Sequence, residues 1–80
     1  MYWVYVLKAE NYKKSYVGYT DDLPRRLDEH NRGQSSYTSK FRPWKIIYGE
    51  EFVTKKEAIS RERFLKSQGG RRFLKNVVFN

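Results

Sequence analysis

The first apolar segment of the chain, Tyr2–Leu7, alternates like a β-strand but is apolar on both of its faces. Successive strand side chains point to opposite sides, and each side here receives three of them: Tyr2, Val4 and Val6 on one, and Trp3, Tyr5 and Leu7 on the other. Both sides need cover from water. The segment therefore predicts a strand that is packed between two layers.

A second segment of strand chemistry, Ser15–Tyr19, follows the short polar stretch 10–14. β-Branched and aromatic residues dominate both segments, so we expect them to pair as an antiparallel hairpin. From Leu23 the apolar spacing changes to that of a helix. The preceding pair of aspartates would cap this helix, which would end near Gly33.

The second half of the chain predicts one more strand and two more helices. Residues 31–43 are polar and without period, which is typical of a loop, and Trp44–Val53 returns to strand chemistry. Thr54 and Glu57 then form a capping box, the signature of a helix start. We expect this helix to run to Ser67 and to be stopped by the glycines at 69 and 70. The apolar stripe of a third helix follows: Phe73, Leu74, Val77 and Val78.

The predicted order is therefore β-β-α-β-α-α. This is an α+β fold, resembling an α/β sandwich, in which helices flank a small three-stranded antiparallel sheet. Eighty residues suffice for one domain, 1–80, and not for two. Because chains this short bury only about 60 to 65% of their unfolded surface, we expect the functional site at the edge of the core, with no small-molecule cofactor.

The chain has no cysteine, which excludes a disulfide framework, a thiolate zinc site, an iron–sulfur cluster and a cysteine nucleophile. No apolar run approaches the roughly 20 residues that span a bilayer, and the N-terminal segment is too short and too aromatic for a signal peptide. We therefore expect a soluble cytoplasmic protein without a membrane partner.

Charge and aromatic content indicate a polyanionic partner. The 17 Lys and Arg residues outnumber 9 Asp and Glu residues, so the net charge is +8, and the C-terminal half carries most of it. Phe, Trp and Tyr make up 18% of the side chains. A small domain that is both basic and rich in aromatic residues is typical of proteins that bind nucleic acid.

Three groups of polar residues are candidates for chemistry. The first is Tyr5 and Tyr16, one in each strand of the predicted hairpin. Tyrosine is common in sheets, so a structural role is the more frequent explanation of either residue alone. Gly18 favours a site nearby, because glycine inside a strand often marks the close approach of a ligand or another backbone.

The second group is Arg26 and His30, which lie four residues apart and share one face of the first predicted helix. A guanidinium presents its donors in the geometry that a phosphate accepts, so Arg26 indicates an anion site. The alternatives are a surface ion pair of Arg26 with Asp22 or Glu29, and a histidine that merely packs at the margin of the core.

The third candidate is Glu62, which falls on the inward stripe of the second predicted helix, between Ala58, Ile59 and Leu65. A carboxylate there is costly unless a cation meets it. That cation is either a basic side chain or a metal ion. Mg²⁺ suits this composition, because it commonly takes one or two protein carboxylates and completes its shell with water and phosphate.

In the order and spacing of these residues the chain resembles the GIY-YIG endonuclease superfamily, in particular its small single-domain bacterial members. The two tripeptides that name the family resemble Val4-Tyr5-Val6 and Tyr16-Val17-Gly18. Four further positions match an arginine, a histidine, a glutamate and a later lysine of the family: Arg26, His30, Glu62 and Lys66. The likeness extends over residues 2–74.

The chain departs from the family at some positions. Tyr19 stands where some members have a lysine, so Tyr19 is a candidate for substrate binding or for a different proton donor. The late asparagine of some members has only Asn76 as a counterpart. Lys66 and Lys40 are further candidates for binding the substrate.

The resemblance implies hydrolysis of DNA phosphodiester bonds with one divalent ion, Mg²⁺ or Mn²⁺, held by Glu62. It implies that Tyr5 or Tyr16 takes the proton of the attacking water and that Arg26 holds the scissile phosphate. His30 would donate a hydrogen bond to phosphate or relay a proton. Without an added recognition domain, we expect recognition of DNA structure or backbone, in DNA repair or in the processing of structured DNA.

Two other functions fit the same residues. One is a nucleic-acid-binding module without turnover, which would use the basic C-terminal half and exposed aromatic residues such as Trp44 or Tyr37 for stacking. The other is a nuclease subunit that a protein partner activates.

Overall fold

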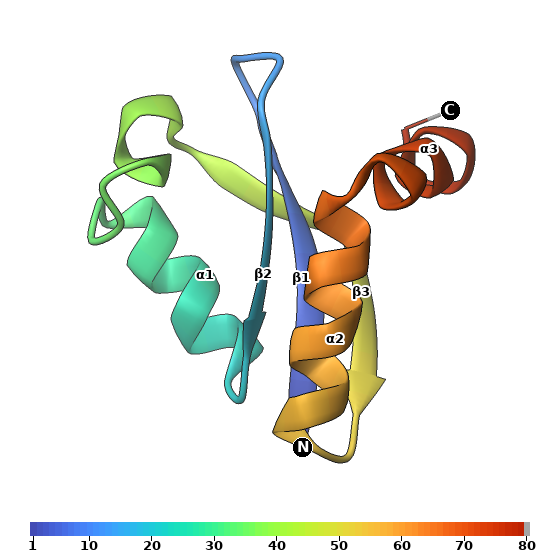
Figure 1. The fold of residues 1–80 in the computed structure, drawn as a ribbon. Helices are drawn as coiled ribbons and strands as arrows, with labels where there is room; N and C mark the ends of the chain where they lie inside the picture. The colour runs from blue at the N-terminus through green and yellow to red at the C-terminus, as the bar shows by residue number, and fades with distance from the viewer. Residues whose placement is uncertain (80) are drawn as a thin grey trace.

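The computed structural model describes residues 1–79, and a three-stranded antiparallel sheet forms the centre of this part of the chain (Figure 1). β1 (Tyr2–Ala9) is the middle strand, with β2 (Ser15–Thr20) and β3 (Trp44–Phe52) on either side of it. The α+β class and the order β-β-α-β-α-α are confirmed.

Helices cover both faces of the sheet. α1 (Leu23–Asn31) and the short 3₁₀ helix η1 (Thr38–Phe41) lie on one face, and α2 (Lys55–Lys66) and α3 (Gln68–Val77) lie on the other. Figure 1 shows β2 running between α1 and α2. None of the helices within residues 1–79 combines the length and the apolar character that crossing a bilayer requires.

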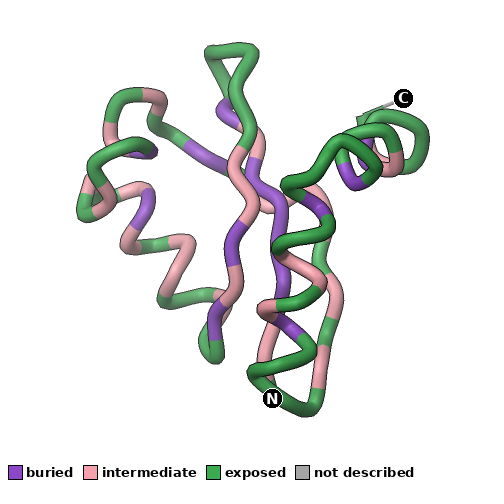
Figure 2. Tube along the Cα trace, viewed as in Figure 1, coloured by how far each residue is buried: buried purple, intermediate pink, exposed green. Residues whose placement is uncertain are grey.

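β1 is packed between the two helical layers, as its two apolar faces predict. Its central residues, from Val4 to Leu7, are at most 1% exposed, and Figure 2 shows the buried positions concentrated along this strand. Val4 and Val6 pack under α2 and α3, whereas Tyr5 and Leu7 pack toward α1 and η1. The alternation of one strand thus builds two apolar clusters.

The predicted helix starts are confirmed in detail. Asp22 caps α1, because its Oδ1 accepts a hydrogen bond from the Arg25 amide at 3.1 Å. Thr54 and Glu57 form the reciprocal capping box at the start of α2. These caps satisfy amides that would otherwise lack partners in the first turn of each helix.

Two local predictions are wrong. Residues 31–43 are not wholly irregular, because they contain η1. The glycines at 69 and 70 do not stop α2, which ends at Lys66, but lie in the first turn of α3. A Cβ at Gly70 would overlap the backbone of Phe64 and Leu65, so this glycine allows α2 and α3 to turn sharply against each other.

Candidate functional site

Side chains from β1, β2, α1 and α2 meet in an open pocket of about 460 Å³ beside β2. We call it the Tyr5 pocket, and its main lining residues are Tyr5, Tyr16, Tyr19, Arg26, Lys55 and Glu62. Four of the five predicted catalytic residues are among them. Residues that are distant in the sequence therefore share one solvent-open hollow at the edge of the sheet.

Gly18 explains how an inner-strand tyrosine reaches a pocket beside an edge strand. It lies opposite Tyr5 in the β1–β2 pairing. A Cβ at this position would lie 2.6 Å from the Tyr5 hydroxyl and 3.0 Å from the Tyr16 ring. The missing side chain thus makes room for both rings, whose centroids are 6.3 Å apart.

Arg26 lines the pocket and also forms an ion pair. Its Nη1 lies 2.9 Å from Oε1 of Glu29, so the predicted surface pair with Glu29 is present. Burial lowers the pKa of Arg26, but the contacts with Glu29 and Tyr5 outweigh burial and raise it above its usual value. The guanidinium therefore stays charged and is held in place at the pocket wall.

His30 lies behind the pocket rather than in its wall. The side chain is 0% exposed, with Nε2 at 2.9 Å from the Tyr5 hydroxyl and Nδ1 at 2.8 Å from Oγ1 of Thr38. Burial, assisted by the nearby Arg26, lowers the pKa of His30 to about 4 against the opposing effect of Glu29. The ring is therefore neutral near pH 7, and it contacts the pocket through the Tyr5 hydroxyl and through the Tyr16 ring, whose centroid lies 4.9 Å away.

Tyr5 keeps its proton in this environment. Burial raises the pKa of Tyr5 to about 12, and Arg26 offsets only part of this effect. A hydroxyl with such a pKa is a hydrogen-bond donor near neutral pH and a poor candidate for a general base.

Glu62 forms an ion pair with a basic side chain, which is one of the two kinds of cation predicted to balance it. Its Oε2 lies 3.3 Å from Nζ of Lys66, and its side chain is 16% exposed. Lys66 itself is exposed and lies with its Nζ 5.9 Å from the centroid of the Tyr16 ring. The carboxylate is thus balanced by an exposed cation.

The side chains of the Tyr5 pocket fit a divalent metal ion that takes few of its ligands from the protein. Within residues 1–79 no three His, Cys, Asp or Glu side chains gather around a common point, so a cage made of protein ligands is not formed. Glu62 is an accessible carboxylate in an open pocket. Mg²⁺ and Mn²⁺ bind oxygen ligands, and Mg²⁺ commonly relies on one or two carboxylates, water and phosphate, which this pocket can accommodate.

The remaining predicted binding residues lie at different places. Tyr19 lines the Tyr5 pocket, whereas Lys66 lines a neighbouring hollow, and Lys40 lies exposed on η1 away from both. The prediction that Trp44 is an exposed stacking residue is wrong. Its side chain is only 2% exposed, and its Nε1 donates a hydrogen bond to the Thr38 carbonyl. Tyr37 is 43% exposed, as that prediction requires.

Sequence reasoning missed several residues of this region, among them Asp21, Lys55 and Thr38. Lys55 lines the Tyr5 pocket, and its place seven residues before Glu62, on the same helix face, could have revealed it. Thr38, the partner of His30, carries no such signal because it lies in a segment without period.

The fold and the pocket define a small α+β domain with an arginine and a carboxylate gathered beside two tyrosines at a sheet edge. A family model described as the GIY-YIG catalytic domain matches residues 1–76. The chain therefore belongs to the GIY-YIG family. Membership indicates a nuclease that acts on DNA, and nucleases of this family generally depend on a divalent metal ion.

Similar proteins are small bacterial ones. A UPF0213 protein of Staphylococcus saprophyticus is 36% identical over 77 residues, which cover 95% of this chain and 93% of that protein. Another, from Staphylococcus aureus strain Mu3, is 39% identical over 67 residues, covering 82% and 80%. The solution NMR structure of a UPF0213 protein from Bacillus halodurans matches with a TM-score of 0.56 and 29% identity, over 95% of this chain and 83% of that one.

Proposed function

We propose that this protein is an endonuclease that hydrolyses DNA phosphodiester bonds at the Tyr5 pocket with Mg²⁺ or Mn²⁺. The observation that carries the proposal is the convergence of Tyr5, Tyr16, Arg26 and Glu62, from four different elements, on one open pocket. Membership of the GIY-YIG family supports the same reaction.

Arg26 binds the scissile phosphate in this mechanism. Its permanent charge offsets the negative charge that grows on the phosphate oxygens in the transition state, and the Glu29 pair holds the guanidinium ready before the substrate arrives. A preorganised donor of this kind needs no reorganisation during the reaction, which makes its contribution to the rate large.

Tyr16, reacting as its phenolate, accepts the proton of the attacking water and becomes a neutral phenol, and Tyr5 donates a hydrogen bond that orients the reacting groups. The assignment follows from the environment of Tyr5, whose pKa is about 12 and whose hydroxyl is bonded to neutral His30. His30 and Thr38 are positioning residues in this scheme, because His30 contacts Tyr5 and Tyr16 from behind the pocket and Thr38 bonds to His30.

Glu62 would hold the metal ion, and Lys66, which pairs with Glu62 here, would bind the DNA backbone. A bound divalent ion supplies positive charge that stabilises the leaving oxygen. We propose that the chain forms one domain, 1–80, that recognises backbone and DNA structure, in repair or processing of structured DNA in the cytoplasm.

Cleavage assays with two variants test this function. A labelled panel of single-stranded, duplex, flap and junction DNA, with RNA beside it, is incubated with protein and Mg²⁺ or Mn²⁺. Glu62→Gln should abolish cleavage, and Tyr16→Phe should reduce the rate by about 10² to 10⁴, the usual contribution of general base catalysis. Glu51→Gln, an exposed carboxylate change on β3, should leave the rate unchanged.

Equal cleavage by the parent and by folded Glu62→Gln would show that a contaminant is the nuclease. Tight DNA binding with no cleavage by the parent, in either metal and over the whole panel, would instead select the binding module without turnover.

A further inference from the structure

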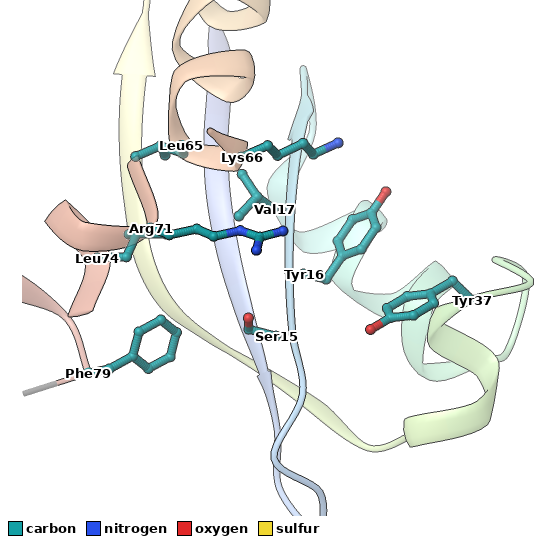
Figure 3. Close-up of a pocket in the computed structure, with 9 residues that line it drawn as sticks. All are labelled: Ser15, Tyr16, Val17, Tyr37, Leu65, Lys66, Arg71, Leu74 and Phe79. Carbon is teal, nitrogen blue, oxygen red and sulfur yellow. The ribbon is translucent and has the colours of Figure 1, made fainter. Parts of the chain in front are cut away.

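A second hollow, of about 500 Å³, shares Tyr16 with the Tyr5 pocket. We call it the Arg71 pocket, and Figure 3 shows its lining, chiefly Tyr16, Val17, Tyr37, Lys66, Arg71 and Phe79. Because Tyr16 lines both pockets, they are contiguous across this ring. A strand whose phosphate lies in the Tyr5 pocket could therefore extend into the Arg71 pocket.

The Arg71 pocket contains an aromatic platform. Tyr37 is 43% exposed, and its ring stacks on Tyr16 with centroids 6.3 Å apart and an angle of 29° between the planes. Phe41 packs against Tyr37 at 5.4 Å and limits its movement. An exposed ring held in place in this way is suited to stacking with a nucleobase, which all four bases can do.

Two cations complete the lining. Figure 3 shows Lys66 from α2 reaching over β2 and Arg71 from α3 extending toward β2. Among residues 1–79 no carboxylate lines the pocket and Arg71 forms no ion pair. Lys66 is paired with Glu62 of the neighbouring pocket. The pocket therefore attracts an anion, and its aromatic platform suits a base attached to that anion.

We propose that the Arg71 pocket binds an unpaired nucleotide next to the scissile phosphate, with its base on Tyr37 and its phosphate between Lys66 and Arg71. Bases within a duplex are already stacked on their neighbours, so the face of Tyr37 is open only to a base outside the duplex. The substrate class is thus DNA with a single-stranded segment at the cleavage position. This inference rests on the proposed nuclease function.

Binding measurements without cleavage test the inference. Fluorescence anisotropy in EDTA compares a duplex with the same duplex carrying a single-stranded flap. The parent should bind the flap DNA more tightly, and Tyr37→Leu should reduce this preference about 5- to 150-fold, the value of one stacked base. Arg71→Gln should weaken flap binding and lower its logarithmic salt dependence by about 0.7.

Matched variants separate the pocket from general effects. Tyr37→Phe keeps the ring and should keep the preference. Arg72→Gln removes the neighbouring charge on α3 and should leave the flap-to-duplex ratio unchanged. If the Tyr37→Leu protein does not fold, Arg71→Gln tests the inference in its place. A flap-to-duplex ratio that Arg71→Gln leaves unchanged overturns the inference.

The outcomes distinguish this inference from the proposed function. A parent that cleaves DNA but shows no flap preference, or a Tyr37→Leu protein that retains the preference, overturns the inference and leaves the nuclease intact. A parent that prefers flap DNA in EDTA but cuts nothing in Mg²⁺ or Mn²⁺ overturns the nuclease and leaves the nucleotide pocket standing.

Discussion

The buried, neutral His30 predicts that acid destabilises this protein in a defined pH range. The pKa of His30 is about 4 in the folded chain, and an unfolded histidine has a pKa of about 6.5. Between these values the unfolded chain binds a proton that the folded chain does not, so the free energy of unfolding falls as the pH falls. The stability contributed by the neutral ring is complete above pH 6.5 and lost by about pH 4.

The size of the effect follows from the gap between the two pKa values. At 1.36 kcal/mol for each pH unit, the loss is about 3 kcal/mol. The free energy of unfolding of native proteins is only about 5 to 15 kcal/mol, so a loss of this size is easily measured. Groups around the ring act in both directions, since Arg26 opposes protonation of His30 and Glu29 favours it, but burial dominates.

Urea unfolding of the parent and of His30→Gln at several pH values between 7 and 4.5 measures this contribution. Carboxylates titrate in both proteins, so the difference between them isolates the histidine. His30 is the only histidine of the sequence, and NMR can therefore follow its titration without ambiguity. Parallel loss of stability in the two proteins, together with a His30 pKa near 6.5, would refute the reasoning.

Two other changes have expected outcomes. Gly18→Ala should lower the cleavage rate about 10- to 100-fold, because the new Cβ displaces the rings of Tyr5 and Tyr16, and steady-state kinetics on the best substrate measures it. The bidentate pair of Arg61 and Glu50, at 2.8 and 3.0 Å, should be worth about 1 to 3 kcal/mol of stability. A double-mutant cycle with Arg61→Gln and Glu50→Gln measures it by urea unfolding, and no coupling between the two changes would contradict the estimate.

Local sequence patterns predicted most of the fold. The capping residues Asp22 and Thr54, the strand alternation and the change of period at Leu23 all act between near neighbours, and the structure confirms them. Gly70 misled the prediction, because a glycine that ends a helix and a glycine that permits two helices to approach closely have the same local sequence signature.

The residues of the candidate site were predicted from their order and spacing, but their environments were not. Arg26 and Glu62 face one pocket only because α1 and α2 lie on opposite sides of β2. Trp44 shows the same limit, because an aromatic residue at a strand start is equally compatible with a surface or a buried position.

The sequence by itself determined which residues are available to this protein: a strand apolar on both faces, a basic and aromatic composition, and five polar residues at set intervals. Only the tertiary structure decided the state of those residues. It buried His30 against Tyr5, which lies 25 residues away, and thereby keeps the proton on Tyr5 and off the ring near pH 7. Burial and charge depend on groups brought together from distant parts of the chain, and no pattern among neighbouring residues contains that information.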